Sequence, residues 1–228
     1  RALASILGAG LKWQSGIRVE CLEEKTSGVF LHAHKASFGP FDHVICAVQA
    51  NHLDFLPDQY SQETKILKEF PYDAGSLWVH RDERFMPDKI EDWSPIHYQM
   101  DETFTQSMFS VWINPIEPSL KQHEPVFQTW NPIFEPKQEK VIAKVTMERA
   151  VVNQNNRMLL KELDHIQKVP SRKVYFCGSY AVPGVPLLES AIRSAIKVVG
   201  YLGLDPDQLV KREASQESLE TSSPPLAA

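Results

Sequence analysis

The stretch from Lys173 to Leu204 constrains the fold more than any other part of the sequence. An apolar, β-rich run stops at Gly178, and after a proline-containing turn a helical pattern extends from Leu187 to Leu204. Its apolar residues recur at helical spacing: Ala191, Ile192, Ala195, Val198, Val199 and Leu202. This pattern predicts a buried strand, a glycine where something approaches the backbone closely, and a helix N-terminus suited to an anionic or carbonyl-rich ligand. An ordinary strand–loop–helix unit of an α/β protein gives the same pattern.

The residues of this stretch resemble a cofactor motif. Phe176–Tyr180 and the helix start at residues 189–195 are similar to the C-terminal flavin motif of FAD-dependent amine-oxidase-like oxidoreductases. The resemblance implies that the backbone approaches FAD at the strand end, that the next residues contact its ribityl–phosphate region, and that the helix start lies under the flavin carbonyls. The residues that this places against FAD are Gly178, Ser179, Tyr180, Glu189, Ser190 and Ala191. Ser179 stands where many members have an acidic residue.

The first sixty residues predict a helix end followed by a small β-rich segment. Residues 1–11 have the pattern of a helix that ends at its glycines, and residues 17–22 and 29–34 form a predicted hairpin around a Gly-containing turn. A buried strand over residues 41–48 and a short helix over 51–56 follow. The resemblance places the backbone of Val19 against the adenine of FAD.

A dinucleotide-binding fingerprint is missing from these residues. Gly8-Ala9-Gly10 follows no strand, and Trp13 occupies the position of the third glycine. A complete member of the family opens with a strand, a Gly-x-Gly-x-x-Gly turn and a helix that holds the FAD pyrophosphate. The sequence is therefore similar to the C-terminal portion of such a flavoprotein, without its phosphate-binding unit.

Residues 61–150 have a different character. A helix over residues 61–70 precedes β-rich runs over 75–80, 103–114, 126–131 and 141–147, with no helical pattern between them. Consecutive strands of this kind predict an antiparallel sheet. Its many aromatic residues either pack a core or form the wall of an apolar substrate cavity, for which the candidates are Trp93, Trp112, Trp130 and Asn131.

The order of motifs in this region resembles one branch of the family, the NAD/FAD-binding proteins found beside or fused to cyclopropane-fatty-acid synthases. The expected fold is α/β (α+β): a partial FAD-binding, Rossmann-like domain of amine-oxidase type with an inserted antiparallel-sheet substrate domain. We expect the FAD-binding domain in residues 1–60 and 151–204, the substrate domain in 61–150, and a disordered tail over 205–228.

Composition and charge exclude several classes of protein. A net charge of −5 argues against a nucleic-acid partner, and no apolar run is long enough for a transmembrane segment. Three cysteines in strand-like runs and no visible signal peptide lead us to expect a reducing, cytoplasmic location. His32 and His34 share a strand face without a third ligand nearby, so no metal site is predicted.

Two functions agree with this sequence. The first is the C-terminal part of an FAD-dependent oxidoreductase, whose flavin accepts a hydride from a C–N or C–C bond of a small-molecule or lipid-like substrate. No motif identifies a catalytic residue, and His80 and His97 are candidates for a general base by residue type alone. The alternative is a non-catalytic remnant or interaction module that has lost cofactor binding.

Overall fold

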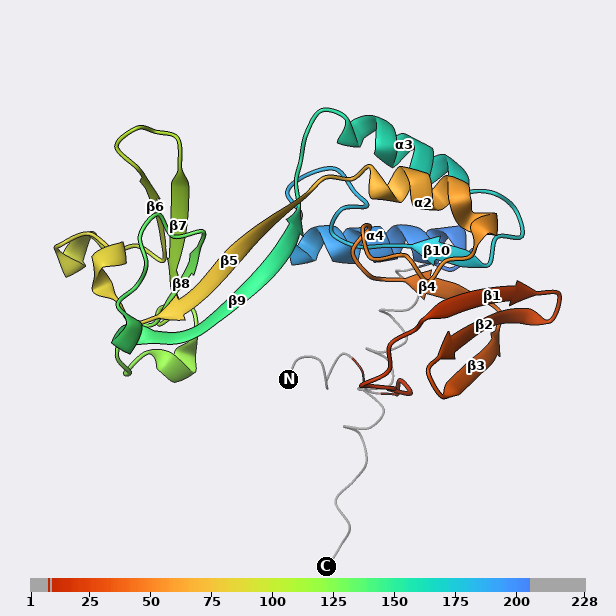
Figure 1. The fold of residues 1–228 in the computed structure, drawn as a ribbon, viewed down its shortest axis with the longest axis horizontal. Coiled ribbons are helices and arrows are strands. Elements are labelled where there is room, and N and C mark those ends of the chain that lie inside the picture. The colour runs from red at the N-terminus through yellow and green to blue at the C-terminus, as the bar shows by residue number, and fades with distance from the viewer. Residues whose placement is uncertain (1–7, 9, 206–228) are drawn as a thin grey trace, which may run out of the picture. The chain divides into compact units, whose positions relative to one another are not determined.

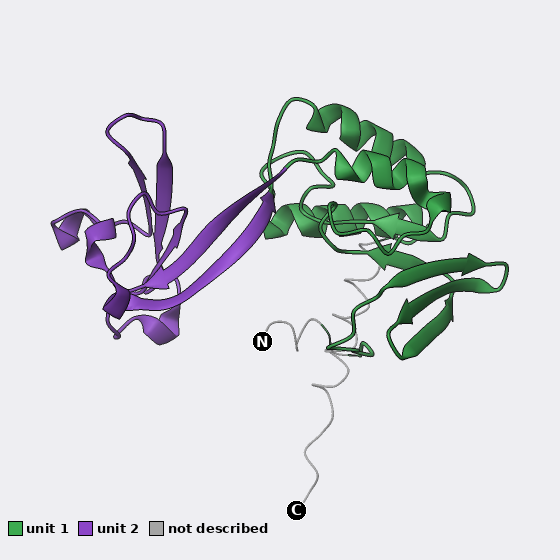
Figure 2. Cartoon of the chain, in the orientation of Figure 1, with its two compact units in different colours: residues 1–71, 150–228 green, residues 72–149 purple. Residues whose placement is uncertain are grey.

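The computed structural model describes residue 8 and residues 10–205, and it divides the chain into two compact units (Figure 2). Unit 1 comprises residues 1–71 and 150–228, and unit 2 comprises residues 72–149. Helix α2 (Ser61–Lys68), which the sequence analysis assigned to the inserted segment, belongs to unit 1. The expected helix over residues 1–11 and the expected tail over 205–228 lie almost entirely outside the described residues.

A three-stranded antiparallel meander opens unit 1 (Figure 1). Strand β1 (Cys21–Lys25) pairs with β2 (Gly28–Ala33), which pairs in turn with β3 (Ala36–Phe41). Gly28 has a φ of +138°, and a Cβ atom on it would lie 2.8 Å from the carbonyl oxygen of Phe41. The close approach of β3 therefore requires glycine at this turn. The predicted hairpin is confirmed, although its first strand starts later than expected and the third strand was not foreseen.

A short parallel pair of strands follows the meander. β4 (Val44–Cys46) lies beside β10 (Val174–Phe176), with Val44 opposite Val174 and Cys46 opposite Phe176. The helix expected over residues 51–56 is wrong, because the segment makes only isolated turns, such as the bond from Leu56 N–H to the Leu53 carbonyl. Pro57 follows directly and disfavours a helical conformation at the residue before it.

Three helices in the described part of unit 1 pack against one another or against the β4–β10 pair (Figure 1). After the single 3₁₀ turn Asp58–Tyr60, helix α2 packs against α3 (Asn156–Gln167) through fully buried leucines such as Leu67 and Leu163. Helix α4 (Leu188–Tyr201) packs Val198 against Tyr175 and Cys177 at the end of β10. The helix α4 and the strand before it were predicted from the sequence, whereas α3 was not.

The second edge of β10 is closed by side chains. The Lys173 carbonyl and the Cys177 N–H bond to β4, so the backbone groups of the alternate residues face the other way. There the Phe176 N–H donates to Gln167 Oε1 at 2.6 Å, and Arg172 Nε donates to the Val174 carbonyl at 2.5 Å. Two polar side chains thus satisfy backbone groups that a further strand would otherwise pair.

Unit 2 is built on a five-stranded sheet in the order β6-β7-β8-β5-β9. The strands are β5 (Tyr72–His80), β6 (Ile96–Met100), β7 (Ser107–Trp112), β8 (Phe127–Trp130) and β9 (Val141–Ala150). Short 3₁₀ turns connect them at Glu83–Phe85, Ile90–Asp92, Pro118–Leu120 and Gln138–Lys140. The predicted antiparallel sheet is confirmed. The strand expected over residues 103–114 is shorter, because Asp101 accepts hydrogen bonds from the N–H groups of Thr105 and Gln106 and forms a hairpin turn there.

The two faces of this sheet differ in burial. On one face, Trp78, His80, Met108, Ser110, Phe127 and Thr129 are buried. The neighbouring rings of Phe85 and Phe134 lie 4.3 Å apart at an angle of 34°, and the His80 ring lies 4.4 Å from that of Phe85. The opposite face, here called the apolar face, contains the residues paired across β6, β7, β8 and β5: the apolar Ile96, Tyr98, Met100, Phe109, Val111, Trp130, Leu77 and Val79, and the polar Ser107 and Gln128. Ile96, Tyr98 and Met100 on it are about half exposed or more.

Candidate functional site

The strand end at Gly178 is tied to helix α4. Gly178 N–H donates to Ser194 Oγ at 2.9 Å, and the Ser194 hydroxyl donates to the Ala191 carbonyl at 2.7 Å. Gly178 has a φ of +158°, and a Cβ atom there would lie 2.6 Å from the ring of Tyr180. Any larger residue would displace that buried tyrosine, so the backbone needs glycine at this position.

The loop after Gly178 is held at both ends. The Ala181 N–H donates to the Gly178 carbonyl at 3.0 Å, and the Tyr180 ring packs edge-on against Phe70 with centroids 5.2 Å apart. At the far end, the Ser190 hydroxyl donates to the Val185 carbonyl at 2.7 Å. The loop therefore leads from the carboxyl end of a parallel strand to the N-terminus of α4, which is the usual place for a ligand in such sheets.

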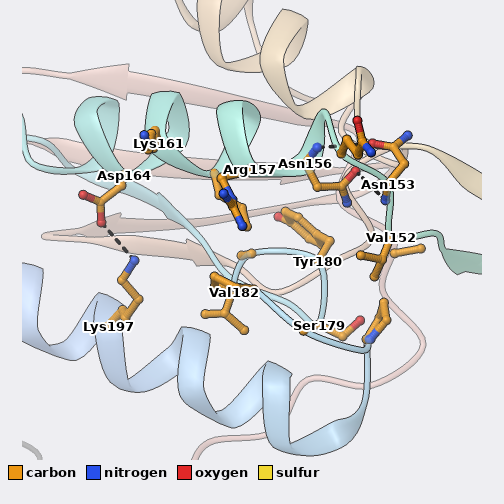
Figure 3. Close-up of a pocket in the computed structure, with 17 residues that line it drawn as sticks. Val152, Asn153, Asn156, Arg157, Lys161, Asp164, Ser179, Tyr180, Val182 and Lys197 are labelled. Carbon is orange, nitrogen blue, oxygen red and sulfur yellow. Dashed lines mark hydrogen bonds and ion pairs between the residues drawn. The ribbon is translucent and has the colours of Figure 1, made fainter.

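A groove of about 770 Å³ lies along this loop within unit 1. Figure 3 shows α3 on one side, α4 on the other and the loop between them, with Arg157 extending from α3 toward Tyr180 and Val182. The loop contributes mainly apolar side chains, and α3 contributes polar and charged ones. The lining residues used below are Asn153, Asn156, Arg157, Lys161, Ser179 and Tyr180, together with Val182 and Pro186.

The charged groups at one end of the groove neutralise each other. Asp164 of α3 accepts hydrogen bonds from Lys197 of α4 at 2.9 Å, from Lys168 at 2.6 Å, and from the Tyr201 hydroxyl. Burial acts to raise the pKa of Asp164, but these three donors outweigh it and hold the pKa well below its usual range. Asp164 is therefore ionised at neutral pH and fixes α3 to α4.

The structure brings only part of the predicted cofactor set to this groove. Ser179 and Tyr180 line it, and Gly178 directly precedes them. Ser190 and Ala191 support the loop from behind through their bonds to Val185 and Ser194. Glu189 is exposed in the first turn of α4, and Val19 is half-buried in the extended segment before β1, so neither lines the groove.

Sequence reasoning missed the residues of α3 in the groove. Arg157, Lys161 and Asp164 are spaced at i, i+4 and i+7, which places them on one face of a helix. The sequence contains this spacing, but no helix was predicted over residues 156–167. Without a helix, the spacing does not indicate that the three side chains share a face.

The predicted substrate residues lie in unit 2 and fall into two sets. Trp93 and Trp112 meet edge-on with ring centroids 5.2 Å apart, on the covered face of the sheet that also holds Phe127. Trp130 lies on the apolar face opposite Phe109 and beneath the Arg149 guanidinium, 4.7 Å away. Asn131 accepts a hydrogen bond from Ser76 N–H at 2.8 Å, which fixes the strand end.

The two histidines considered as general bases differ in accessibility. His80 is 0% exposed, and its Nδ1 accepts a hydrogen bond from the Asp82 N–H at 3.2 Å. Its Nε2 therefore bears the hydrogen and donates to Thr129 Oγ1 at 2.8 Å, and Thr129 in turn lies 2.7 Å from Ser110 Oγ. Burial lowers the pKa of His80 to about 4, so the ring is neutral at physiological pH. His97 is half-buried on β6, opposite Ser110.

Two further observations bear on the kind of site present. Among the described residues, no group of three or more His, Cys, Asp or Glu side chains is placed to hold a metal ion. In the same part of the chain, no helix is long and apolar enough to span a membrane.

Comparison with known proteins identifies the fold. No protein-family model matches the sequence, and no curated protein matches it. The structure is similar to that of a reduced UDP-galactopyranose mutase, with a TM-score of 0.55 and 11% identity over 86% of this chain and 48% of that one. It is also similar to a CLA-producing fatty acid isomerase from P. acnes, with a TM-score of 0.53 and 10% identity over 87% of this chain and 51% of that one.

The chain thus spans about half the length of these two structures. At such low identity the likeness shows the fold alone. It confirms the predicted fold class, an α/β (α+β) fold in which an antiparallel-sheet unit is inserted between the two parts of another unit.

Proposed function

We propose that this chain forms part of an FAD-dependent oxidoreductase of amine-oxidase type and contributes to its flavin site. The observation on which this rests is the groove that begins directly after Gly178, where the carboxyl end of β10 and the N-terminus of α4 meet. Ligands of parallel α/β sheets bind at such strand ends. The resemblance of residues 176–180 and 189–195 to a flavin motif indicates that this ligand is FAD.

The residues present fit a flavin dinucleotide. A groove of about 770 Å³ has the size of a cofactor site, and its mixture of an aromatic ring, aliphatic side chains and cations suits a planar, anionic molecule. Gly178, Ser179 and Tyr180 would face the cofactor, while Ser194 and Ser190 hold the loop in place. When bound, FAD would supply the acceptor for a hydride from a C–N or C–C bond.

The substrate in this proposal is apolar or lipid-like. The apolar face of unit 2 offers aliphatic and aromatic side chains to such a molecule, among them Tyr98 and Met100. The structural neighbours are compatible with both halves of the proposal, since one was solved in a reduced state and the other acts on a fatty acid. Because His80 is buried and neutral, it would serve the fold of unit 2 and not proton transfer.

Flavin titration of two glycine variants tests this function. Gly178→Ala places a methyl group against the Tyr180 ring, whereas Gly200→Ala, in α4, meets nothing within 4 Å. We expect Gly178→Ala to weaken flavin binding at least tenfold and Gly200→Ala to leave it unchanged. Ser179→Leu is the second test, because Ser179 is only half-buried and its replacement fills the groove without disturbing the core.

The titration follows quenching of flavin fluorescence, with far-ultraviolet circular dichroism to show that each variant is folded. Flavin binding that is unaffected by both Gly178→Ala and Ser179→Leu would remove this groove from the site. A protein that binds no flavin at all would favour the non-catalytic interaction module.

A further inference from the structure

The groove between α3 and α4 contains two cations without a carboxylate partner. Lys197 is paired with Asp164, as described above. In the part of the chain that the structure describes, no acidic side chain forms an ion pair with Arg157 or Lys161. Both side chains are exposed and lie one turn apart on α3. The side of the groove that α3 forms therefore has a surplus of positive charge.

The side-chain amides of Asn153 and Asn156, which lie near these cations, are already hydrogen-bonded to the backbone. Asn153 Oδ1 accepts hydrogen bonds from the N–H groups of Asn155 and Asn156 at 2.9 and 3.2 Å. Asn156 Nδ2 donates to the Val151 carbonyl at 3.0 Å. These amides shape the turn into α3, and Arg157 and Lys161 are the charged groups of α3 available to a ligand.

The wall facing the two cations is apolar. Tyr180, Ala181 and Val182 form part of it and are largely buried, and Pro183 and Pro186 line it as well. An arginine and a lysine beside such a wall suit a ligand whose anionic part is a phosphate and whose remaining part is planar or apolar. Phosphate matches the guanidinium geometry and accepts charge-assisted hydrogen bonds from both side chains.

We infer that Arg157 and Lys161 bind the phosphate groups of the cofactor. This inference rests on the proposed flavin site and adds a contact to it. In proteins with a Gly-x-Gly-x-x-Gly turn, backbone N–H groups hold the pyrophosphate. The cations of α3 would supply side-chain contacts in addition, from a segment more than twenty residues before α4.

Flavins with different numbers of phosphates test the inference. Riboflavin has no phosphate and FMN has one, so the ratio of their affinities isolates the phosphate contribution. FAD has two phosphates and an adenosine, and the contribution of the adenosine cancels when the FAD-to-riboflavin ratio is compared between wild type and variants. We expect Arg157→Gln and Lys161→Gln each to reduce affinity for FAD and FMN about tenfold, the effect of losing one charge-assisted hydrogen bond. Affinity for riboflavin should stay within about twofold. Lys65→Gln, an exposed lysine on α2, is the matched control for the change in net charge.

Inorganic pyrophosphate, titrated by calorimetry, separates this inference from the proposed function. If pyrophosphate binds and Arg157→Gln abolishes that binding while no flavin binds, the phosphate site stands and the flavin function fails. If flavins bind and the FAD-to-riboflavin ratio is the same in wild type, Arg157→Gln and Lys161→Gln, the flavin function stands and the inference is overturned. Failure of the protein to bind either pyrophosphate or flavin overturns both.

Discussion

Glu63 and Arg172, 109 residues apart in the sequence, form an ion pair of 2.9 Å that is nearly excluded from solvent. Their side chains are 11% and 7% exposed, respectively. Arg172 also donates to the carbonyl oxygens of Val174 and Ile166. One guanidinium therefore joins α2, the end of α3 and the edge of β10, the strand that leads into the groove.

Breaking this pair should destabilise unit 1 strongly. Glu63→Gln leaves a buried guanidinium without its counter-charge, and losses of this kind cost about 3–5 kcal/mol. The measurement is urea denaturation followed by circular dichroism at 222 nm, because α2, α3 and α4 all belong to unit 1. The exposed pair of Lys68 and Asp54, at the similar distance of 3.0 Å, is the control, and Lys68→Met should change stability by less than about 1 kcal/mol. A similarly small effect for Glu63→Gln would show that water reaches the pair.

Helix α4 shows what a sequence pattern settles and what it leaves open. The helix was predicted correctly because its apolar residues recur every three or four positions. The pattern favoured Ile192 for the core, yet Ile192 is 53% exposed, and the buried stripe is Ser190, Ser194 and Val198. Serines occupy it because they bond to Val185 and Gly178 across a close contact, and hydropathy gives no sign of that bonding.

In the candidate site, too, some residues were predicted from the sequence and others were not. Ser179 and Tyr180 were predicted because they belong to one local strand–loop motif, and local motifs are visible in a single sequence. Arg157 and Lys161 reach the same groove from another segment, and their proximity depends on how α3 packs. In unit 2, the β-rich runs predicted the strands, but the face on which each tryptophan lies depends on register, which turns such as that at Asp101 determine.

Gly75 of β5 should not tolerate a side chain. A Cβ atom there would lie 2.3 Å from the Trp130 ring and 2.5 Å from Asn131 Oδ1. We expect Gly75→Ala to destabilise unit 2 by about 1–3 kcal/mol through overpacking. Gly200→Ala, in open space on α4, should instead stabilise the chain by about 0.5–1 kcal/mol, since alanine is the better helix former. Relative to wild type, the melting temperature should fall in Gly75→Ala and rise in Gly200→Ala. Changes of the same sign and size in both variants would contradict the prediction.

The stability of unit 2 should fall between pH 6.5 and 4. His80 has an ordinary pKa of 6.5 and a folded-state pKa of about 4, lowered mainly by burial. In that interval the unfolded chain binds one more proton than the folded chain, so stability decreases as pH falls, by about 1.4 kcal/mol per pH unit. The total loss is on the order of 3 kcal/mol. Tryptophan fluorescence in urea is the measurement, because four of the five tryptophans, Trp78, Trp93, Trp112 and Trp130, lie in unit 2.

Replacing the histidine separates this effect from that of nearby carboxylates. His80→Phe should remove the slope between pH 4 and 6.5, while the exposed His123→Gln should keep it. Asp82, whose pKa is held low mainly by hydrogen bonds from Arg84, loses its contribution only below its ordinary pKa of 3.8. A slope that persists in His80→Phe would assign the pH dependence to another group.

The apolar face of unit 2 should bind apolar molecules. Tyr98 is 72% exposed and stacks on Phe109 at 5.6 Å, and Ile96 and Met100 flank it on the same strand face. Exposed contiguous apolar surface of this kind marks a binding region more often than chance exposure. We expect the protein to bind the fluorescent probe anilinonaphthalene sulfonate, and Met100→Glu to weaken that binding at least severalfold, because a carboxylate on this surface disfavours both an apolar ring and a sulfonate.

Gln99→Glu is the matched control, since Gln99 lies on the same strand with its side chain on the opposite face. Both variants change the net charge equally, so a difference between them reports the face and not the charge. Equal loss of probe binding in both would mean that the probe responds to net charge, and the apolar face would then have no role as a substrate wall.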